Sequence, residues 1–202
     1  MDATTQNALR AVGVAADLAR AAALCALLWA LIVWSPPNVA RFAVVLALLL
    51  VPRIAGLARP FDAAFGWTMM LATGAEAAGW YATIAWIDWV IHCVTTGAVA
   101  AMAVLVSARV GLMPALQDPT PRRHRAWLVL VTTTTGMSIG VLWEFYEWVT
   151  SQVFGIPMVV GYTDTIADLA MDSLGSMIAG VMVTVWAGQG FTRQRVYLSG
   201  RV

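Results

Sequence analysis

Charged residues are scarce in this sequence. They make up 11% of the 202 residues, against about 25% in soluble domains. Lysine is absent, so all twelve basic residues are arginine. Apolar residues account for 60% of the chain. This composition excludes an ordinary soluble domain and predicts a polytopic membrane protein that folds as a single helical bundle.

Cysteine is equally rare. Cys25 and Cys93 both lie inside apolar segments, which favours small core residues over a disulfide. The sequence also lacks a Gly-rich phosphate loop, a Ser-centred nucleophile elbow, a zincin motif and a CxxC pair. Nothing in it indicates nucleic-acid binding. The chemistry of this protein must therefore come from the few charged residues that it does contain.

Apolar runs bounded by charge, proline or glycine predict an all-α protein with six transmembrane helices. They cover about residues 15–34, 39–57, 61–79, 87–108, 126–150 and 163–187. The second is the weakest of the six, because its uninterrupted apolar run extends only from Phe42 to Pro52. A polar linker rich in proline and arginine, residues 109–125, separates the fourth span from the fifth, and a tail follows at 188–202.

The arginines predict the orientation of these spans. If there are six spans and both termini are cytoplasmic, eleven of the twelve arginines fall on the cytoplasmic side and only Arg41 falls outside. We therefore expect a multi-pass inner-membrane protein with its linker and tail in the cytoplasm. Membrane lipids are its expected surroundings, and a homodimer is left open.

The hydroxyl, glycine and tryptophan residues of the apolar segments are expected to have structural roles. Thr95, Thr96 and residues 132–135 are expected to hydrogen-bond back to their own helices, with a polar cavity as the alternative. Gly136 and Gly140 match the small-xxx-small pattern of close helix packing. Six tryptophans lie where the topology places the outer interface, which favours an aromatic belt over a substrate-stacking box. They are Trp34, Trp80, Trp86, Trp89, Trp143 and Trp148.

Three aspartates mark the last span. Asp164, Asp168 and Asp172 are spaced four residues apart in the apolar stretch 161–180, so they share one helix face over about 12 Å. Ionisable groups at membrane depth are costly and usually face a bundle interior or a wet cavity. The stripe therefore predicts a site. The alternative is that Asp164 only caps the helix and Asp172 is paired structurally.

Two further spans carry acids at the same outer end. Asp88 and His92, four residues apart, open the fourth span, and Glu144 and Glu147, three apart, close the fifth. Together with the three aspartates they give seven ionisable groups that three helices are predicted to bring together in the outer half of the membrane. Glu76, near the outer end of the third span, is a candidate eighth member.

Carboxylates crowded in a low dielectric must take up protons, bind a cation or attract a cationic ligand. Oxygen ligands with one imidazole suit a divalent ion such as Mg, Ca, Mn or Zn. We therefore expect a metal site in which His92, Glu144 and Glu147 are also the candidate catalytic residues. The full candidate ligand set is Asp88, His92, Glu144, Glu147, Asp164, Asp168 and Asp172.

These motifs resemble the YjdF-like family of small bacterial inner-membrane proteins. The matching segments are Asp88-xxx-His92, Trp143-Glu144-Phe145-Tyr146-Glu147-Trp148 and Asp164-Thr165-xx-Asp168-xxx-Asp172-xx-Gly175. The chain is more loosely similar to VanZ-like proteins, from which it departs at Trp89, Glu147 and Asp172, where those proteins usually carry a basic residue, Gln and Asn. The resemblance covers Asp88 to Gly180. It implies a bacterial inner-membrane location and supports the site, but it names no reaction.

The leading hypothesis is a metal-dependent hydrolase or transferase that acts on a lipid or cell-envelope precursor at the outer leaflet. A cation held by Asp88, His92, Glu144 and Asp168 would polarise a phosphoryl or acyl group. A proton- or cation-coupled transporter or channel is the first alternative, although six spans without an internal repeat are few for transport. The second alternative is a non-catalytic scaffold in which the cation pins three helices together.

Overall fold

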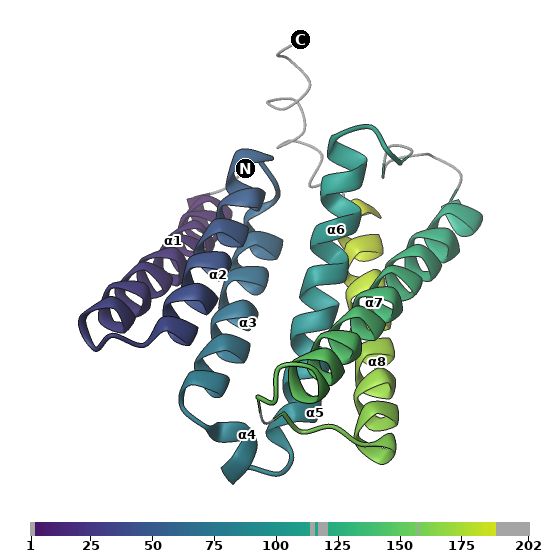
Figure 1. The fold of residues 1–202 in the computed structure, drawn as a ribbon. Coiled ribbons are helices and arrows are strands. Elements are labelled where there is room, and N and C mark those ends of the chain that lie inside the picture. Colours follow the sequence, from purple (N-terminus) through teal and green to yellow (C-terminus); the bar gives the residue numbers. More distant parts are fainter. Residues whose placement is uncertain (1–2, 114–115, 117–120, 157, 189–202) are drawn as a thin grey trace. The chain divides into compact units, whose positions relative to one another are not determined.

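All the secondary structure that the computed structural model describes is helical, as the sequence predicts, and no strand occurs in residues 3–113, 116, 121–156 or 158–188. The predicted tail from residue 189 and six residues of the predicted linker lie outside this description. The chain divides into two compact units, Met1–Ala85 and Trp86–Val202. The helices of both units are labelled in Figure 1.

The first unit contains three long helices, α1 (Ala3–Ile32), α2 (Pro36–Ile54) and α3 (Arg59–Ala77), followed by the short α4 (Trp80–Thr83). Each long helix contacts the other two. Proline occupies the first turn of α2 and of α3, where a missing N–H does no harm. Gly79, with φ of +68°, follows α3 in the left-handed conformation that ends helices.

Arginines neutralise the acids of the first unit. Asp62 of α3 is buried and pairs with Arg20 of α1, while Glu76 at the other end of α3 pairs with Arg41 of α2. Glu76, the candidate eighth site residue, therefore has its own partner within this unit. The ion pairs are Arg20–Asp17 (3.2 Å), Arg20–Asp62 (2.5 Å), Arg41–Glu76 (2.8 Å) and Arg53–Asp17 (2.9 Å).

Five helical segments in the described part of the chain are long and apolar enough to cross a membrane. Only one predicted span is not among them: α3, the third, which carries Asp62 and Glu76. The second span, expected to be the weakest, qualifies as α2. The five segments are Gln6–Ile32, Pro36–Ile54, Ile87–Arg109, Arg122–Gln152 and Tyr162–Gly188.

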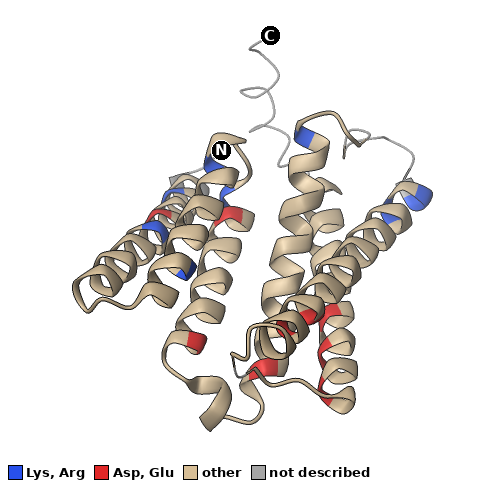
Figure 2. Cartoon of the chain, viewed as in Figure 1, with Lys and Arg blue, Asp and Glu red and all other residues tan. Residues whose placement is uncertain are grey.

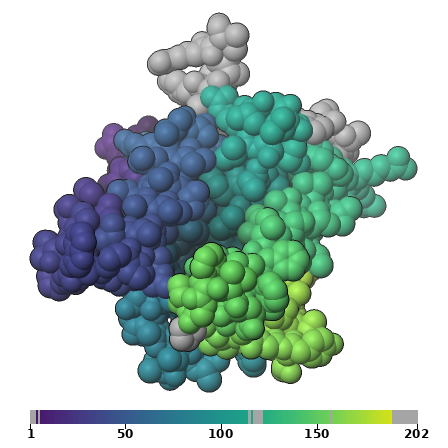
Figure 3. Space-filling model, in the orientation of Figure 1, coloured from purple at the N-terminus to yellow at the C-terminus, as the bar shows by residue number. Residues whose placement is uncertain are grey.

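The second unit is built from three rods. The first is continuous and comprises α5 (Ile87–Ile91), the π-helical turn η1 (His92–Thr96) and α6 (Gly97–Arg109). The other two are α7 (Pro121–Gln152) and α8 (Tyr162–Gly188), which pack extensively on each other, and α8 also contacts η1 and α6. The end of α7 is seen in green at the front of Figure 3. Phe145, Tyr146 and Trp148 in the last turns of this helix are exposed.

Glycines set the close approach of these rods. A Cβ at Gly136 or Gly140 of α7 would overlap the side chains of Ser176 or Asp172 of α8, which confirms the predicted role of the small-xxx-small pattern in internal packing. A Cβ at Gly175 of α8 would overlap the backbone carbonyl of Cys93 in η1. The π-helical turn is therefore packed directly against α8, and such turns are frequent at functional sites.

Candidate metal centre

The described acids of the second unit gather at one end of its three rods, and its described arginines lie at the other end (Figure 2). Asp88 begins the first rod, Glu144 and Glu147 lie near the end of α7, and the three aspartates lie in the first half of α8. Asp168 is fully buried at 0% exposure, and His92 is 1% exposed. Asp88, Glu144, Glu147 and Asp172 are buried as well, and Asp164 is half-buried.

His92 is held by Asp172 through one ring nitrogen. Its Nδ1 lies 3.1 Å from Asp172 Oδ1, and the Thr96 hydroxyl donates to the same oxygen at 2.6 Å. An ionised carboxylate only accepts hydrogen bonds, so Nδ1 donates to Asp172 and Nε2 is the nitrogen left for another ligand when the ring is neutral. Metal-binding histidines are oriented by this same carboxylate–imidazole contact.

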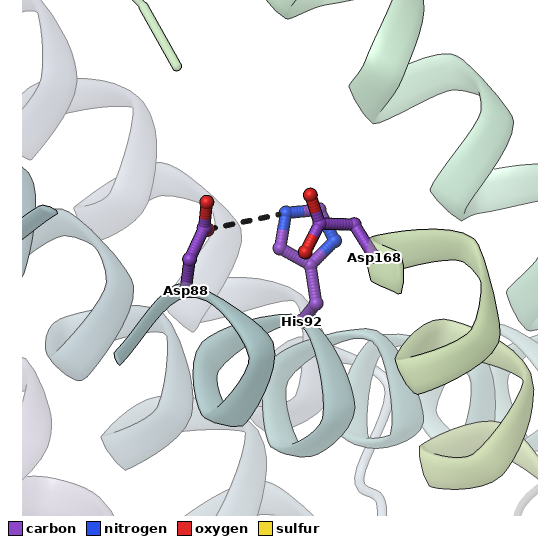
Figure 4. Close-up of side chains that lie close together, drawn as sticks. All are labelled: Asp88, His92 and Asp168. Carbon is purple, nitrogen blue, oxygen red and sulfur yellow. Dashed lines mark ion pairs between the residues drawn. The ribbon is translucent and has the colours of Figure 1, made fainter. Parts of the chain in front are cut away.

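Nε2 of His92 faces two carboxylates. Asp88 Oδ1 lies 3.5 Å from it, one helical turn earlier, and Asp168 approaches from α8 (Figure 4). One ligand atom from each of these three residues lies within 4.8 Å of the other two. Neither Nε2 nor either oxygen of Asp168 has a hydrogen-bond partner among the described residues. The group thus offers one imidazole nitrogen and two carboxylates to a shared ligand.

Glu144 and Glu147 form a second group around the same histidine. Their ligand atoms and a ring nitrogen of His92 again lie within 4.8 Å of one another. The indole N–H of Trp143 donates to Glu147 Oε1 at 2.8 Å, and its ring centre lies 5.2 Å from that of His92 at an interplanar angle of 58°. Trp143 therefore lines the site, a role that the prediction of an aromatic belt missed.

Buried polar atoms without a hydrogen-bond partner are concentrated at this site. Each such atom costs about 1–3 kcal/mol if nothing satisfies it, and one cation satisfies several at once. Within the described residues, the unpartnered site atoms are Asp88 Oδ1, His92 Nε2, Glu144 Oε1, Glu147 Oε2, Asp164 Oδ2, Asp168 Oδ1, Asp168 Oδ2 and Asp172 Oδ2. Carboxylate oxygens with a neutral imidazole are the donor set of a divalent metal ion.

Comparison with known families supports the assignment of this chain as a membrane protein. Residues 17–189 match the family described as "Predicted membrane protein (DUF2238)". The chain belongs to this family. No curated protein and no solved structure matches it. The DUF2238 match includes all seven candidate site residues, and it leaves the narrower YjdF-like and VanZ-like resemblances as predictions.

Two predictions for individual residues of this DUF2238 protein need correction or refinement. Thr132, Thr133 and Thr134 do donate to carbonyls of their own helix, as expected. Thr96 instead donates across to Asp172, because the π-helical turn packs directly against α8. Asp172 is paired within the protein, as the structural alternative held, and its partners are the candidate ligand His92 and Thr96.

Proposed function

We propose that this membrane protein binds a divalent cation through Asp88, His92 and Asp168, with Glu144 and Glu147 completing the site. The observation that carries the proposal is the buried Nε2 of His92. Asp172 fixes the ring from the other side, so the Nε2 lone pair is directed at Asp88 and Asp168 with no hydrogen-bond partner among the described residues. Asp172 thus acts as a positioning residue.

The first unit serves as an internal comparison. Its described acids pair with arginine, whereas no described arginine of the second unit is paired with an acid of the site. Arg109 follows His92 by seventeen residues in one continuous rod, a distance of about 25 Å. No arginine among the described residues of the second unit pairs with these carboxylates, and a bound cation can supply the missing positive charge. An imidazole ligand favours Mn or Zn over Mg or Ca.

We place the site in the outer half of the membrane. Among its described residues, the second unit carries arginines at one end and acids at the other (Figure 2), and the arginine-rich end is the expected cytoplasmic end. In this topology α3 completes a six-span, N-in/C-in protein of a bacterial inner membrane. Arg20 and Arg41 support this assignment, because they neutralise the acids that make α3 too polar to qualify by composition.

The proposed activity is hydrolysis or group transfer on a lipid or cell-envelope precursor at the outer leaflet. When bound, the cation would supply Lewis-acid polarisation of a phosphoryl or acyl oxygen. Glu144 and Glu147 are the candidates to accept a proton, because both have a buried oxygen without a hydrogen-bond partner in the described part of the chain. His92 is better placed as a ligand than as a base. Its Nδ1 is held by Asp172, and its Nε2 faces Asp88.

A transport pathway is less well supported. The buried face of α8 continues from Asp172 to Ser176, and the buried positions after Ser176 are Ala179, Gly180 and Val183. Ser176 is therefore the last fully buried polar residue of α8, and the half-buried Thr184 beyond it donates to Gly180 of its own helix. A relay of protons or cations across the membrane needs polar groups beyond that point.

Metal analysis of the purified protein tests the proposal. We expect stoichiometric divalent metal in the parent and loss of it in Asp168→Asn, which keeps the side-chain shape. Ser173→Ala is the matched control, because the Ser173 hydroxyl donates to Leu169 in its own helix. A parent protein that retains no ion when Mn²⁺ or Zn²⁺ is supplied would remove both the enzyme and the scaffold hypotheses.

Glu147→Gln then separates these two hypotheses. An enzyme should retain its thermal stability with this substitution and lose metal-dependent turnover of phosphate-bearing lipids in vesicles. A structural site should instead lose thermal stability in step with metal content. Loss of ion flux without loss of turnover would favour the transport alternative.

A further inference from the structure

When fully ionised, the acids of this site carry more negative charge than one divalent ion can balance. Apart from Asp172, which is engaged with His92 and Thr96, five buried or half-buried carboxylates surround the imidazole. They belong to Asp88, Glu144, Glu147, Asp164 and Asp168. One divalent cation neutralises two of their five charges, and two cations neutralise four. Uncompensated charge at membrane depth is costly.

The ligands also fall into two groups that cannot share the histidine. Asp88 with Asp168 forms one group around His92, and Glu144 with Glu147 forms the other. Nδ1 of His92 is already engaged by Asp172, so only Nε2 can bind metal, and it can bind one ion. The ion at Asp88 takes this nitrogen, because Nε2 lies 3.5 Å from Asp88 Oδ1. Glu144 and Glu147 then remain as ligands for another ion.

Asp168 can serve both ions. Its side chain has 0% exposure, and both of its oxygens lack a hydrogen-bond partner among the residues that the structure describes. A carboxylate in this condition can bridge two metals through one oxygen to each. Paired metal ions in proteins lie about 3.5–4 Å apart, and both ligand groups reach within 4.8 Å of a His92 ring nitrogen.

We propose that the site binds two divalent cations, one held by Asp88 and His92 and one by Glu144 and Glu147, with Asp168 bridging them. This inference rests on the proposed function, because it assumes that the carboxylates bind metal at all. It goes further in assigning the two glutamates of α7 to an ion of their own. Trp143 supports that assignment, because it donates to Glu147 Oε1 while the buried Oε2 has no hydrogen-bond partner among the described residues.

Titration of the full chain in detergent with Mn²⁺ tests the inference, with stoichiometry and electron paramagnetic resonance as the readouts. We expect two Mn²⁺ per chain and a spectrum broadened by coupling between neighbouring ions. The double variant Glu144→Gln/Glu147→Gln should bind one Mn²⁺ and give the resolved hyperfine spectrum of an isolated ion. Ser173→Ala should behave as the parent does.

The possible results distinguish the inference of two cations from the proposal of a cation site on which it rests. One uncoupled Mn²⁺ in the parent would overturn the second cation and leave the proposed cation site standing. No bound Mn²⁺ in the parent would overturn both. Two ions that remain coupled in the double variant would show that the glutamates do not hold the second ion. The parent titration is decisive even if a variant fails to fold.

Discussion

Asp172→Asn tests whether the carboxylate behind His92 prepares the ring for metal. In the parent, one oxygen of Asp172 accepts from His92 Nδ1 at 3.1 Å and from Thr96 at 2.6 Å. An asparagine oxygen can accept both hydrogen bonds in the same position, so the shape of the site is kept and only the charge is lost. The imidazole then becomes a weaker base and a weaker ligand.

The expected loss in metal affinity is about 10- to 100-fold, the usual effect of removing such a partner, which corresponds to about 1.4–2.7 kcal/mol. Thermal stability should report the same change. At a metal concentration about 100 times the parent dissociation constant, binding stabilises the parent by about 2.7 kcal/mol. The variant should gain only about 0.4–1.4 kcal/mol at that concentration, by the same relation.

Competition with a chelator of known affinity measures the dissociation constant, and melting curves with and without Mn²⁺ measure the stabilisation. Ser173→Ala, one residue further along α8 with its hydroxyl bonded to Leu169, controls for substitution on this helix. Asp172→Ala would be less informative, because it leaves two buried donors unsatisfied at about 1–3 kcal/mol each. Equal metal affinity in Asp172→Asn and the parent would refute the positioning role.

Three further predictions concern the frame around the site. Gly175→Ala should lower stability by about 1–3 kcal/mol, because the new methyl group overlaps the Cys93 carbonyl, whereas Gly74→Ala, which meets no atom within 4 Å, should be neutral or stabilising; equal melting temperatures would contradict this packing. Arg20→Met should cost about 3–5 kcal/mol by leaving Asp62 unpaired, and Arg20→Met/Asp62→Leu should recover much of the loss; a double variant no better than the single would count against the ion pair. Reporter fusions at both termini should give cytoplasmic signals, and an external signal from either would overturn the topology.

Local spacing explains why part of the site was predictable. A helix returns to the same face every three to four residues, so Asp168 and Asp172, or Asp88 and His92, had to lie together once their segments were helical. The apolar runs made the helices evident, and the position of the acids at one end of each run implied that they would meet. The convergence of α5, α7 and α8 follows from these two facts.

The contacts between helices could not be predicted from the sequence. The π-helical turn at His92–Thr96 widens the helix where Gly175 approaches it, and nothing in the local sequence announces that contact. Thr96 could therefore not be assigned to Asp172. Trp143 was interpreted from its place at the membrane interface, although its position four residues before Glu147 was a usable sign of contact.

Pairing between distant helices was equally hidden in the first unit. Arg20 and Asp62 are separated by 42 residues, and Arg41 and Glu76 by 35. Nothing in the sequence near any of these four residues indicates its partner on the other helix. Glu76 was therefore grouped with the acidic site because no local feature indicated that α2 supplies its arginine.

Anomalous scattering from crystals of the Mn²⁺-loaded protein tests whether Asp88, His92 and Asp168 bind a cation, because it locates metal without reference to activity. We expect an anomalous peak beside His92 Nε2, between Asp88 and Asp168. The lack of any metal peak beside His92 Nε2, or a determined structure in which these carboxylates face separate surroundings, would contradict the proposed cation site.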